Sequence, residues 1–191
     1  RRAKSPSLQG GRWGAVHSAL AMTAAEFLTL PDSGRRQELL AGRHFVYSSP
    51  GTRHQQISMR LLLALHDPAA ARGQLFIGRL DVVLSDFDVV QPDLMYVADE
   101  RAHIVTAANI QGAPDLVVEI AGEDTRAQDR VVKRATYERH GVAEYWIIDP
   151  DANTTSVYRR AGGRFVPAAP AEPLTTPLLP GFAIPLDQLF A

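Results

Sequence analysis

The chain has 191 residues, 46% of them hydrophobic and 21% charged, values typical of one globular domain with its own core. It contains no cysteine, which excludes disulfides, zinc–thiolate sites and thiol catalysis and fits a reducing, cytoplasmic setting. The formal net charge of −1 is not the basic balance of an ordinary nucleic-acid-binding domain.

The N-terminal segment differs in composition from the rest of the chain. It is rich in Gly, Ser and Arg and shows no hydrophobic periodicity. We expect residues 1–21 to form a flexible extension and residues 22–191 to form the folded domain. A basic arm that binds nucleic acid is the alternative for the extension. No stretch of the chain approaches the ~20 apolar residues of a membrane span.

Two capping-box spacings predict helix starts in the first third of the chain. Thr23 and Glu26 begin a short helix, and Thr52 and Gln55 begin a longer one with apolar residues at helical period. Gly42 marks the turn of a β-hairpin between these helices. The elements expected here are a helix over 24–30, hairpin strands over 37–41 and 43–48, a helix from 52 to about 67, and strands over 74–78, 80–85 and 89–97.

The second half of the chain alternates strands and helices. A helix over about 125–140 is closed by Gly141, which suits the left-handed conformation of a helix C-terminus. The other elements expected are a polar loop with a short helix over 99–110, strands over 114–121 and 144–149, and an edge hairpin of 154–160 and 164–168. Interleaved strands and helices without an internal repeat predict one mixed α/β or α+β domain.

Glu119 is a charge within an otherwise apolar strand. A buried carboxylate is expensive unless it is paired, protonated or bound to a metal. Alternation along the strand places Glu119 on the same face as Asp115. The helix that follows presents an acid, a lysine and a tyrosine on one face, at Asp129, Lys133 and Tyr137. This combination indicates a site.

Asp93 follows a proline at the start of another apolar segment. If neighbouring strands bring Asp93 and Glu119 together, a divalent cation relieves their repulsion most simply, and oxygen ligands suit Mg²⁺ or Mn²⁺. Such a metal lowers the pKa of a bound water and stabilises phosphate charge, while Lys133 stabilises the phosphate or orients the water. The predicted chemistry is phosphodiester hydrolysis. The alternatives are a plain Glu119–Lys133 ion pair and a turn role for Asp93.

The helix predicted over about 125–140 carries more cations than acids. It therefore offers a local row of positive charges for phosphate groups, a phosphate track, although the net charge of the whole chain is only −1. These cations are Arg126, Arg130, Lys133, Arg134 and Arg139. We expect DNA as the partner, with phosphate contacts from Arg126, Arg130 and Arg134.

Five ordered motifs between Thr23 and Phe190 resemble the large bacterial family of putative restriction endonucleases, which is similar in fold to the PD-(D/E)xK nuclease superfamily. The motifs are QPD at 91–93, PDLVVEI at 114–120, DRVVKRATY at 129–137, GVAEYWIIDP at 141–150 and LPG at 179–181. The resemblance implies a restriction endonuclease-like central mixed sheet flanked by helices over 55–66 and 125–140. It also implies Mg²⁺-dependent DNA cleavage and a homodimer, because nucleases of this fold often pair to cut both strands.

The resemblance adds two candidate site residues and two departures. Glu38 corresponds to the family's glutamate before the hairpin turn, and His54 to the histidine that opens the following helix. The superfamily lysine two residues after the second acid is Ala121 here, so its function would move to Lys133. The family serine three residues after that acid is Gly122. A solvated hairpin position for Glu38 and a capping role for His54 remain the plain alternatives.

Other polar residues are expected to be scaffold. Asp115, although it stands in a Pro-Asp pair, is predicted to be a turn or strand-start residue, and Asp81 is at most a minor member of the site. Tyr137 is predicted to pack rather than react. The competing function is a catalytically inactive module of the same fold that binds DNA or protein, and a third is hydrolysis of a different phosphate ester.

Overall fold

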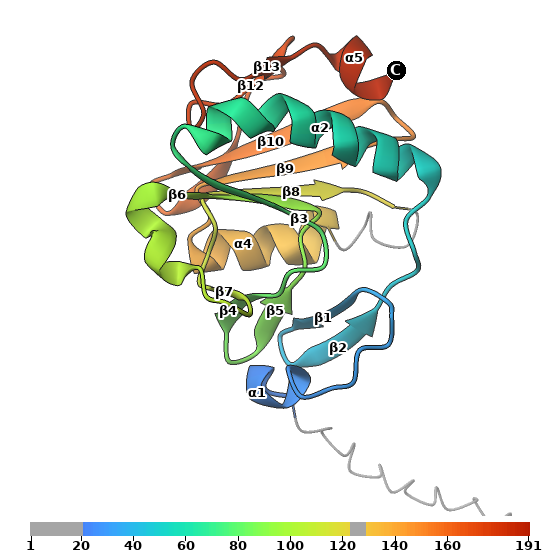
Figure 1. The fold of residues 1–191 in the computed structure, drawn as a ribbon, viewed down its shortest axis with the longest axis vertical. Coiled ribbons are helices and arrows are strands. Elements are labelled where there is room, and N and C mark those ends of the chain that lie inside the picture. Colours follow the sequence, from blue (N-terminus) through green and yellow to red (C-terminus); the bar gives the residue numbers. More distant parts are fainter. Residues whose placement is uncertain (1–20, 123–128) are drawn as a thin grey trace, which may run out of the picture.

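A computed structural model describes residues 21–122 and 129–191 (Figure 1). The helices are α1 (Ala24–Phe27), α2 (Thr52–Ala70), α4 (Arg134–His140) and α5 (Leu186–Phe190), with a 3-10 helix η1 (Asp99–Ile104) and a π-helix η2 (Asp129–Lys133). The strands are β1 (Gln37–Leu40), β2 (Arg43–Val46), β3 (Gly73–Ile77), β4 (Val82–Ser85), β5 (Asp88–Val90), β6 (Leu94–Ala98), β7 (Ile110–Gln111), β8 (Leu116–Ile120), β9 (Glu144–Asp149), β10 (Thr154–Ala161), β11 (Arg164–Pro167), β12 (Leu174–Thr175) and β13 (Ala183–Ile184).

The strands form two larger sheets and a short ribbon. The central sheet has six strands in the order β11-β10-β9-β8-β6-β3, and it is mixed because β8 and β9 run parallel. The smaller sheet has five strands in the order β2-β1-β5-β4-β7, and β12 pairs with β13. The mixed α/β architecture predicted from the sequence is therefore confirmed.

Both faces of the central sheet are covered (Figure 1). Helix α2 and the C-terminal segment lie on one face, where Leu61 and Phe182 belong to the same core as Trp146. Helix α4 and the smaller sheet cover the other face, where Val90 packs in a second core with Tyr145. The smaller sheet therefore shares one core with the α4 side of the central sheet.

Strand β8 shows the alternation that the sequence predicts. Leu116, Val118 and Ile120 belong to the core under α2, whereas Val117 belongs to the opposite core. Glu119 has the same parity as Val117, so it points toward α4 and the smaller sheet. Glu119 is only 1% exposed, which makes its ion pairs decisive for the stability of this layer.

Several local predictions are confirmed by the structure. The Thr23 side chain and the Glu26 carboxylate form the predicted capping box. The hairpin turns at Gly42, whose φ of +73° follows Ala41 at +49°, a pair of positive values that suits a two-residue hairpin loop. Gly141 closes α4 with a φ of +92°.

The single strand predicted over 89–97 is wrong. The run divides into β5, in the smaller sheet, and β6, in the central sheet. Pro92 lies in the break, where it lacks the N–H that a continuous ladder would need. The break places Asp93 where the two sheets meet.

Two helix predictions also need correction. Gly51, not Thr52, occupies the N-cap of α2, so the second predicted capping box does not form. That helix continues through Pro68 to Ala70, since a proline in the last turn removes little of the hydrogen-bond ladder. The helix predicted from about 125 can be followed only from Asp129, and the first described part of it, Asp129–Lys133, is a π-helix; residues 123–128 lie outside the described residues.

Of the predicted extension, residues 1–20 lie outside the described residues. In the parts of the chain that the structure describes, no helix is both long and apolar enough to cross a bilayer.

Candidate active site

Asp93 and Glu119 face each other across neighbouring strands. The antiparallel register pairs Leu94 with Val118. Asp93 comes one residue before Leu94, and Glu119 comes one residue after Val118, so the two acids lie next to each other. The N–H of Ile120 donates to Asp93 Oδ2 at 2.7 Å, which fixes this carboxylate next to β8. The structure thus brings together two carboxylates that stand 26 residues apart in the sequence.

Lys133 and Tyr137 reach Glu119 from the helical segment that covers it. Lys133 Nζ and the Tyr137 hydroxyl both donate to Glu119 Oε1, at 2.9 Å and 2.6 Å. Both side chains are fully buried. Tyr137 also packs on Tyr145, with ring centroids 4.9 Å apart. The tyrosine therefore combines the predicted packing role with a hydrogen bond to the acid.

Glu38 joins the cluster from the smaller sheet. Its Oε1 accepts from Lys133 Nζ at 2.9 Å and from the N–H of Gln91 at 3.0 Å. Its side chain is fully buried, so it is not the solvated hairpin residue of the plain alternative. Glu38 and Glu119 share one lysine, and this sharing ties the two sheets together at the site.

Arg36 is the member of the site that the sequence analysis missed. Its guanidinium contacts three acids: Nη2 lies 2.9 Å from Glu38 Oε1 and 2.7 Å from Glu119 Oε2. Nη1 lies 3.3 Å from Asp93 Oδ1. No strand pattern pointed to it, because Arg36 precedes β1 and its contacts depend on how the two sheets pack.

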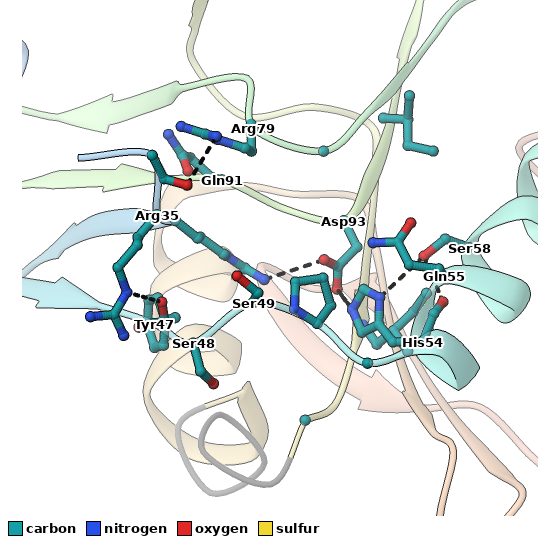
Figure 2. A pocket seen from close by; sticks show the side chains of 18 residues that line it. Arg35, Tyr47, Ser48, Ser49, His54, Gln55, Ser58, Arg79, Gln91 and Asp93 are labelled. Atoms are coloured by element: carbon teal, nitrogen blue, oxygen red, sulfur yellow. Dashed lines mark hydrogen bonds and ion pairs between the residues drawn. The ribbon is translucent and has the colours of Figure 1, made fainter. Parts of the chain in front are cut away.

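His54 lies at the start of α2 and faces Asp93, with Nε2 at 3.3 Å from Asp93 Oδ2 (Figure 2). Its other ring nitrogen lies 3.4 Å from the Ser58 hydroxyl, which donates to the His54 carbonyl oxygen at 2.9 Å. The imidazole is thus held on both sides. It is 14% exposed, so it remains accessible from solvent.

The surroundings keep the acids charged and the phenols neutral. Burial acts to raise the pKa of Glu38 and of Asp93, but the Arg36 guanidinium outweighs it, with help from Lys133 and His54 respectively, and both pKa values lie below their ordinary range. Burial and the charge of Glu119 raise the pKa of Tyr137 well above its ordinary value. Tyr137 is therefore a hydrogen-bond donor at neutral pH.

A cleft of about 570 Å³ opens beside these residues (Figure 2). Arg36, His54 and Asp93 line it, whereas Glu119 and Lys133 lie behind it. The other polar side chains of its wall are those of Arg35, Tyr47, Ser48, Ser49, Gln55, Ser58, Arg79 and Gln91. Arginine, histidine and hydroxyl groups in one concave surface suit a phosphate ester.

The predicted phosphate track lies elsewhere in the part of the chain that can be described. Arg130 pairs with Asp149 at 3.0 Å, and Arg134 stacks over the Tyr158 ring, 5.2 Å from its centroid. Neither lines the cleft. Arg126 lies outside the described residues.

The two acids predicted to be scaffold bind neighbouring polar groups. Asp115 accepts from the N–H of Ala98 at 2.9 Å and from Arg101 at 3.0 Å, at the opposite end of β8 from Glu119. Asp81 accepts from the Gln91 amide at 2.8 Å. Asp115 therefore supports the strand connection and does not enter the cleft.

The carboxylates of Asp93 and Glu119 suit an oxygen-preferring divalent cation only if that cation replaces the Arg36 guanidinium between them. Asp93 Oδ1 and Glu119 Oε2 both contact Arg36, so a cation in place of its guanidinium would meet two carboxylate oxygens. In residues 21–122 and 129–191, no group of three or more histidine, cysteine, aspartate or glutamate side chains could hold a metal ion.

A family model named Uma2 and described as a putative restriction endonuclease matches residues 24–187. The chain belongs to the Uma2 family. This membership confirms the family resemblance read from the five motifs. No curated protein matches this Uma2 chain.

A solved structure supports the fold of this Uma2 protein. The crystal structure of a putative nuclease belonging to DUF820 from Anabaena variabilis superposes with a TM-score of 0.75 at 22% sequence identity. The match covers 88% of this chain and 97% of the other. At this identity, the likeness shows a shared fold.

Proposed function

We propose that this Uma2 protein is a metal-dependent endonuclease that hydrolyses DNA phosphodiester bonds. The observation that carries the proposal is the position of Asp93, just before β6, next to Glu119 of β8 and beside a polar cleft, with Lys133 bound to Glu119. Family membership supports a nuclease, and DNA is the substrate class that a restriction endonuclease cleaves.

Asp93 and Glu119 are the residues that would hold Mg²⁺ or Mn²⁺. Such an ion, when bound, supplies an activated water and stabilises charge on the phosphate oxygens. The chain's own groups prepare the site: the Ile120 N–H fixes one acid, and Lys133 with Tyr137 fixes the other. These contacts hold each carboxylate in one orientation before substrate arrives.

Lys133 acts through Glu119 and Glu38 rather than on the phosphate. It is fully buried and bound to both acids at 2.9 Å, so its charge does not reach the cleft in this arrangement. The direct phosphate contact expected from the sequence would require it to leave both partners. We therefore assign Lys133 and Glu38 positioning roles.

His54 is the group best placed to handle a proton at the cleft. It lines the cleft and contacts Asp93, while Ser58 lies at its second nitrogen. An imidazole in this position can accept a proton from the attacking water or give one to the leaving oxygen. Arg35 and Arg79, on the cleft wall, are the cations best placed for flanking phosphates.

The proposal includes a cytoplasmic homodimer, in which two copies cut the two strands of a duplex. The lack of cysteine suits a reducing compartment. Light scattering of the purified protein, alone and with duplex DNA, measures its oligomeric state.

One observation favours a second candidate function, a DNA-binding module without catalysis. Arg36 already pairs with both Asp93 and Glu119, so the acids have a cationic partner without a metal. An inactive member of the family would bind duplex DNA in the cleft without cutting it.

Plasmid cleavage separates the two candidates. The wild type is incubated with supercoiled DNA and Mg²⁺ or Mn²⁺, beside Asp93→Asn, Glu119→Gln and the matched control Asp115→Asn. We expect each site variant to lower the cleavage rate about 10³-fold, while the control, whose acid lies outside the cleft, keeps the wild-type rate. Equal cleavage by wild type and both site variants, or DNA binding without cleavage by any of them, would contradict the nuclease assignment.

A further inference from the structure

Arg36 separates the cleft from the acids behind it. It lines the cleft and is 17% exposed, whereas Glu38 and Glu119 are 0% and 1% exposed and do not line it. Its guanidinium contacts both of these acids and Asp93. Anything that approaches Glu119 from the cleft therefore meets Arg36 first.

The charges of the cluster show what Arg36 replaces. Three carboxylates stand against two permanent cations, Arg36 and Lys133. Without Arg36 the cluster would hold two uncompensated negative charges in a buried place, which is costly. A divalent cation carries the matching charge.

The position of the Arg36 guanidinium also suits a divalent cation. Its two terminal nitrogens contact Asp93 Oδ1 and Glu119 Oε2, one oxygen of each carboxylate. A metal ion bound to both oxygens would stand where the guanidinium lies and would repel it, because both are cations.

The rest of the cluster can stay in place when Arg36 moves. Lys133 and Tyr137 bind the other oxygen of Glu119, and the Ile120 N–H binds the other oxygen of Asp93. The Arg36 guanidinium lies 5.5 Å from the Tyr47 ring centroid, beside open space in the cleft. The arginine therefore has room to turn away from the acids toward the place where a phosphate would lie.

We propose that Arg36 is an internal latch on the site: its guanidinium occupies the cation position between Asp93 and Glu119, and a divalent cation binds only when Arg36 leaves it. The inference rests on the proposed function and adds a regulated step to it. The released arginine turns into the cleft, where the negative phosphates of a nucleic acid give it new partners. Substrate and metal then favour the same unlatched state, so each strengthens the binding of the other.

Mn²⁺ binding to the full chain tests the latch without nucleic acid. Free Mn²⁺ is followed by electron paramagnetic resonance during titration of the wild type, Arg36→Gln and Arg101→Gln. The control breaks another arginine–aspartate pair, that of Arg101 with Asp115 at 3.0 Å. We expect Arg36→Gln to bind Mn²⁺ about tenfold more tightly than the wild type, because the latched state no longer competes. The control should keep the wild-type affinity.

Two results would overturn the latch: equal or weaker Mn²⁺ binding by Arg36→Gln, or no binding by any of the three proteins. Arg36→Gln is expected to fold best with the metal present, so its titration is accompanied by thermal melting with and without Mn²⁺. The rise of its melting temperature on adding Mn²⁺ should exceed that of the wild type. An equal rise would also count against the proposal.

A measurement on the wild type does not depend on the variant folding. Phenylglyoxal modifies accessible arginines, and mass spectrometry locates the modified residues. Without metal, Arg36 should resist modification. As Mn²⁺ is added, up to its solubility limit, Arg36 should become reactive, while exposed Arg164 reacts equally with and without Mn²⁺. Equal protection of Arg36 in both states would overturn the latch.

The latch and the nuclease function fail in different ways. Tighter Mn²⁺ binding by Arg36→Gln without DNA cleavage by any variant leaves the latch standing and removes the nuclease. Metal-dependent cleavage with unchanged Mn²⁺ affinity in Arg36→Gln leaves the nuclease standing and removes the latch.

Discussion

At the scale of single residues, the site is an ion-pair network in which one oxygen, Glu38 Oε1, accepts from three different residues. Glu38 Oε1 accepts from Lys133, Arg36 and the Gln91 N–H, whereas Oε2 is buried and makes no hydrogen bond within the described residues. The Tyr47 hydroxyl is buried near it, and burial together with the charge of Glu38 raises the Tyr47 pKa well above its ordinary value, yet the two groups form no well-aligned bond. The cluster therefore depends on its two cations.

The buried Lys133 provides a test of this dependence. Lys133→Met should lower the free energy of unfolding by about 3–5 kcal/mol, because it leaves buried carboxylates without their cation. Urea denaturation measures the loss. Adding Glu38→Gln removes one of the stranded charges, so the double variant should recover part of that loss. A loss below about 1 kcal/mol, the level of a surface pair, would show that the buried network contributes little.

The site residues differ in how far the sequence could predict them. Glu119, Lys133 and Asp93 could be found because a charge in an apolar strand, helical spacing and strand pairing are local or nearly local patterns. The burial of Lys133 and the place of Arg36 could not be found in this way. Both depend on the packing of the smaller sheet against the central one, and no periodicity reports that contact.

At the scale of elements, the break between β5 and β6 organises the site. β5 continues into the smaller sheet and β6 into the central one, so the turn between them carries Asp93 at the junction. The pattern predicts one strand over 89–97 because the segment is apolar on both sides of Pro92. The apolar run is real, but each half is buried in a different sheet.

Asp88, at the start of β5, connects three neighbouring elements through hydrogen bonds and an ion pair. It accepts from the N–H of Ala41 at 2.9 Å, from Ser85 at 2.8 Å and from Arg139 at 3.0 Å. Burial acts to raise the pKa of Asp88, but the Ala41 and Ser85 hydrogen bonds outweigh it and lower that pKa below its ordinary value. The charged form is therefore the one that stabilises the fold.

The lowered pKa gives a pH-dependent prediction. Because the folded pKa lies below the unfolded one, the contribution of Asp88 is complete above pH about 4 and is lost as the pH falls through the folded pKa. Asp88→Asn should cost about 1–2 kcal/mol at pH 7 in urea denaturation, and the difference from wild type should shrink in more acidic buffers. A difference that stays constant down to pH about 2 would contradict this assignment.

At the scale of the whole molecule, the site exists because two sheets meet. Glu38 comes from β1 of the smaller sheet, with Arg36 just before it, and Glu119 comes from β8 of the central sheet, with Asp93 just before β6. Helices, the first hairpin and the face of β8 could be predicted from caps, turns and alternation. The division into two sheets could not, since strand order depends on contacts between distant segments. The family resemblance supplied the architecture that local patterns left open.

The central claim is that a divalent cation binds between Asp93 and Glu119 in place of the Arg36 guanidinium. The most direct measurement is an anomalous difference map from crystals of the wild type grown with Mn²⁺. We predict one peak bonded to both carboxylates, with the Arg36 side chain turned into the cleft. A map without a peak there, in which Arg36 still bridges Asp93 and Glu119 at Mn²⁺ concentrations that support DNA cleavage, would contradict the claim.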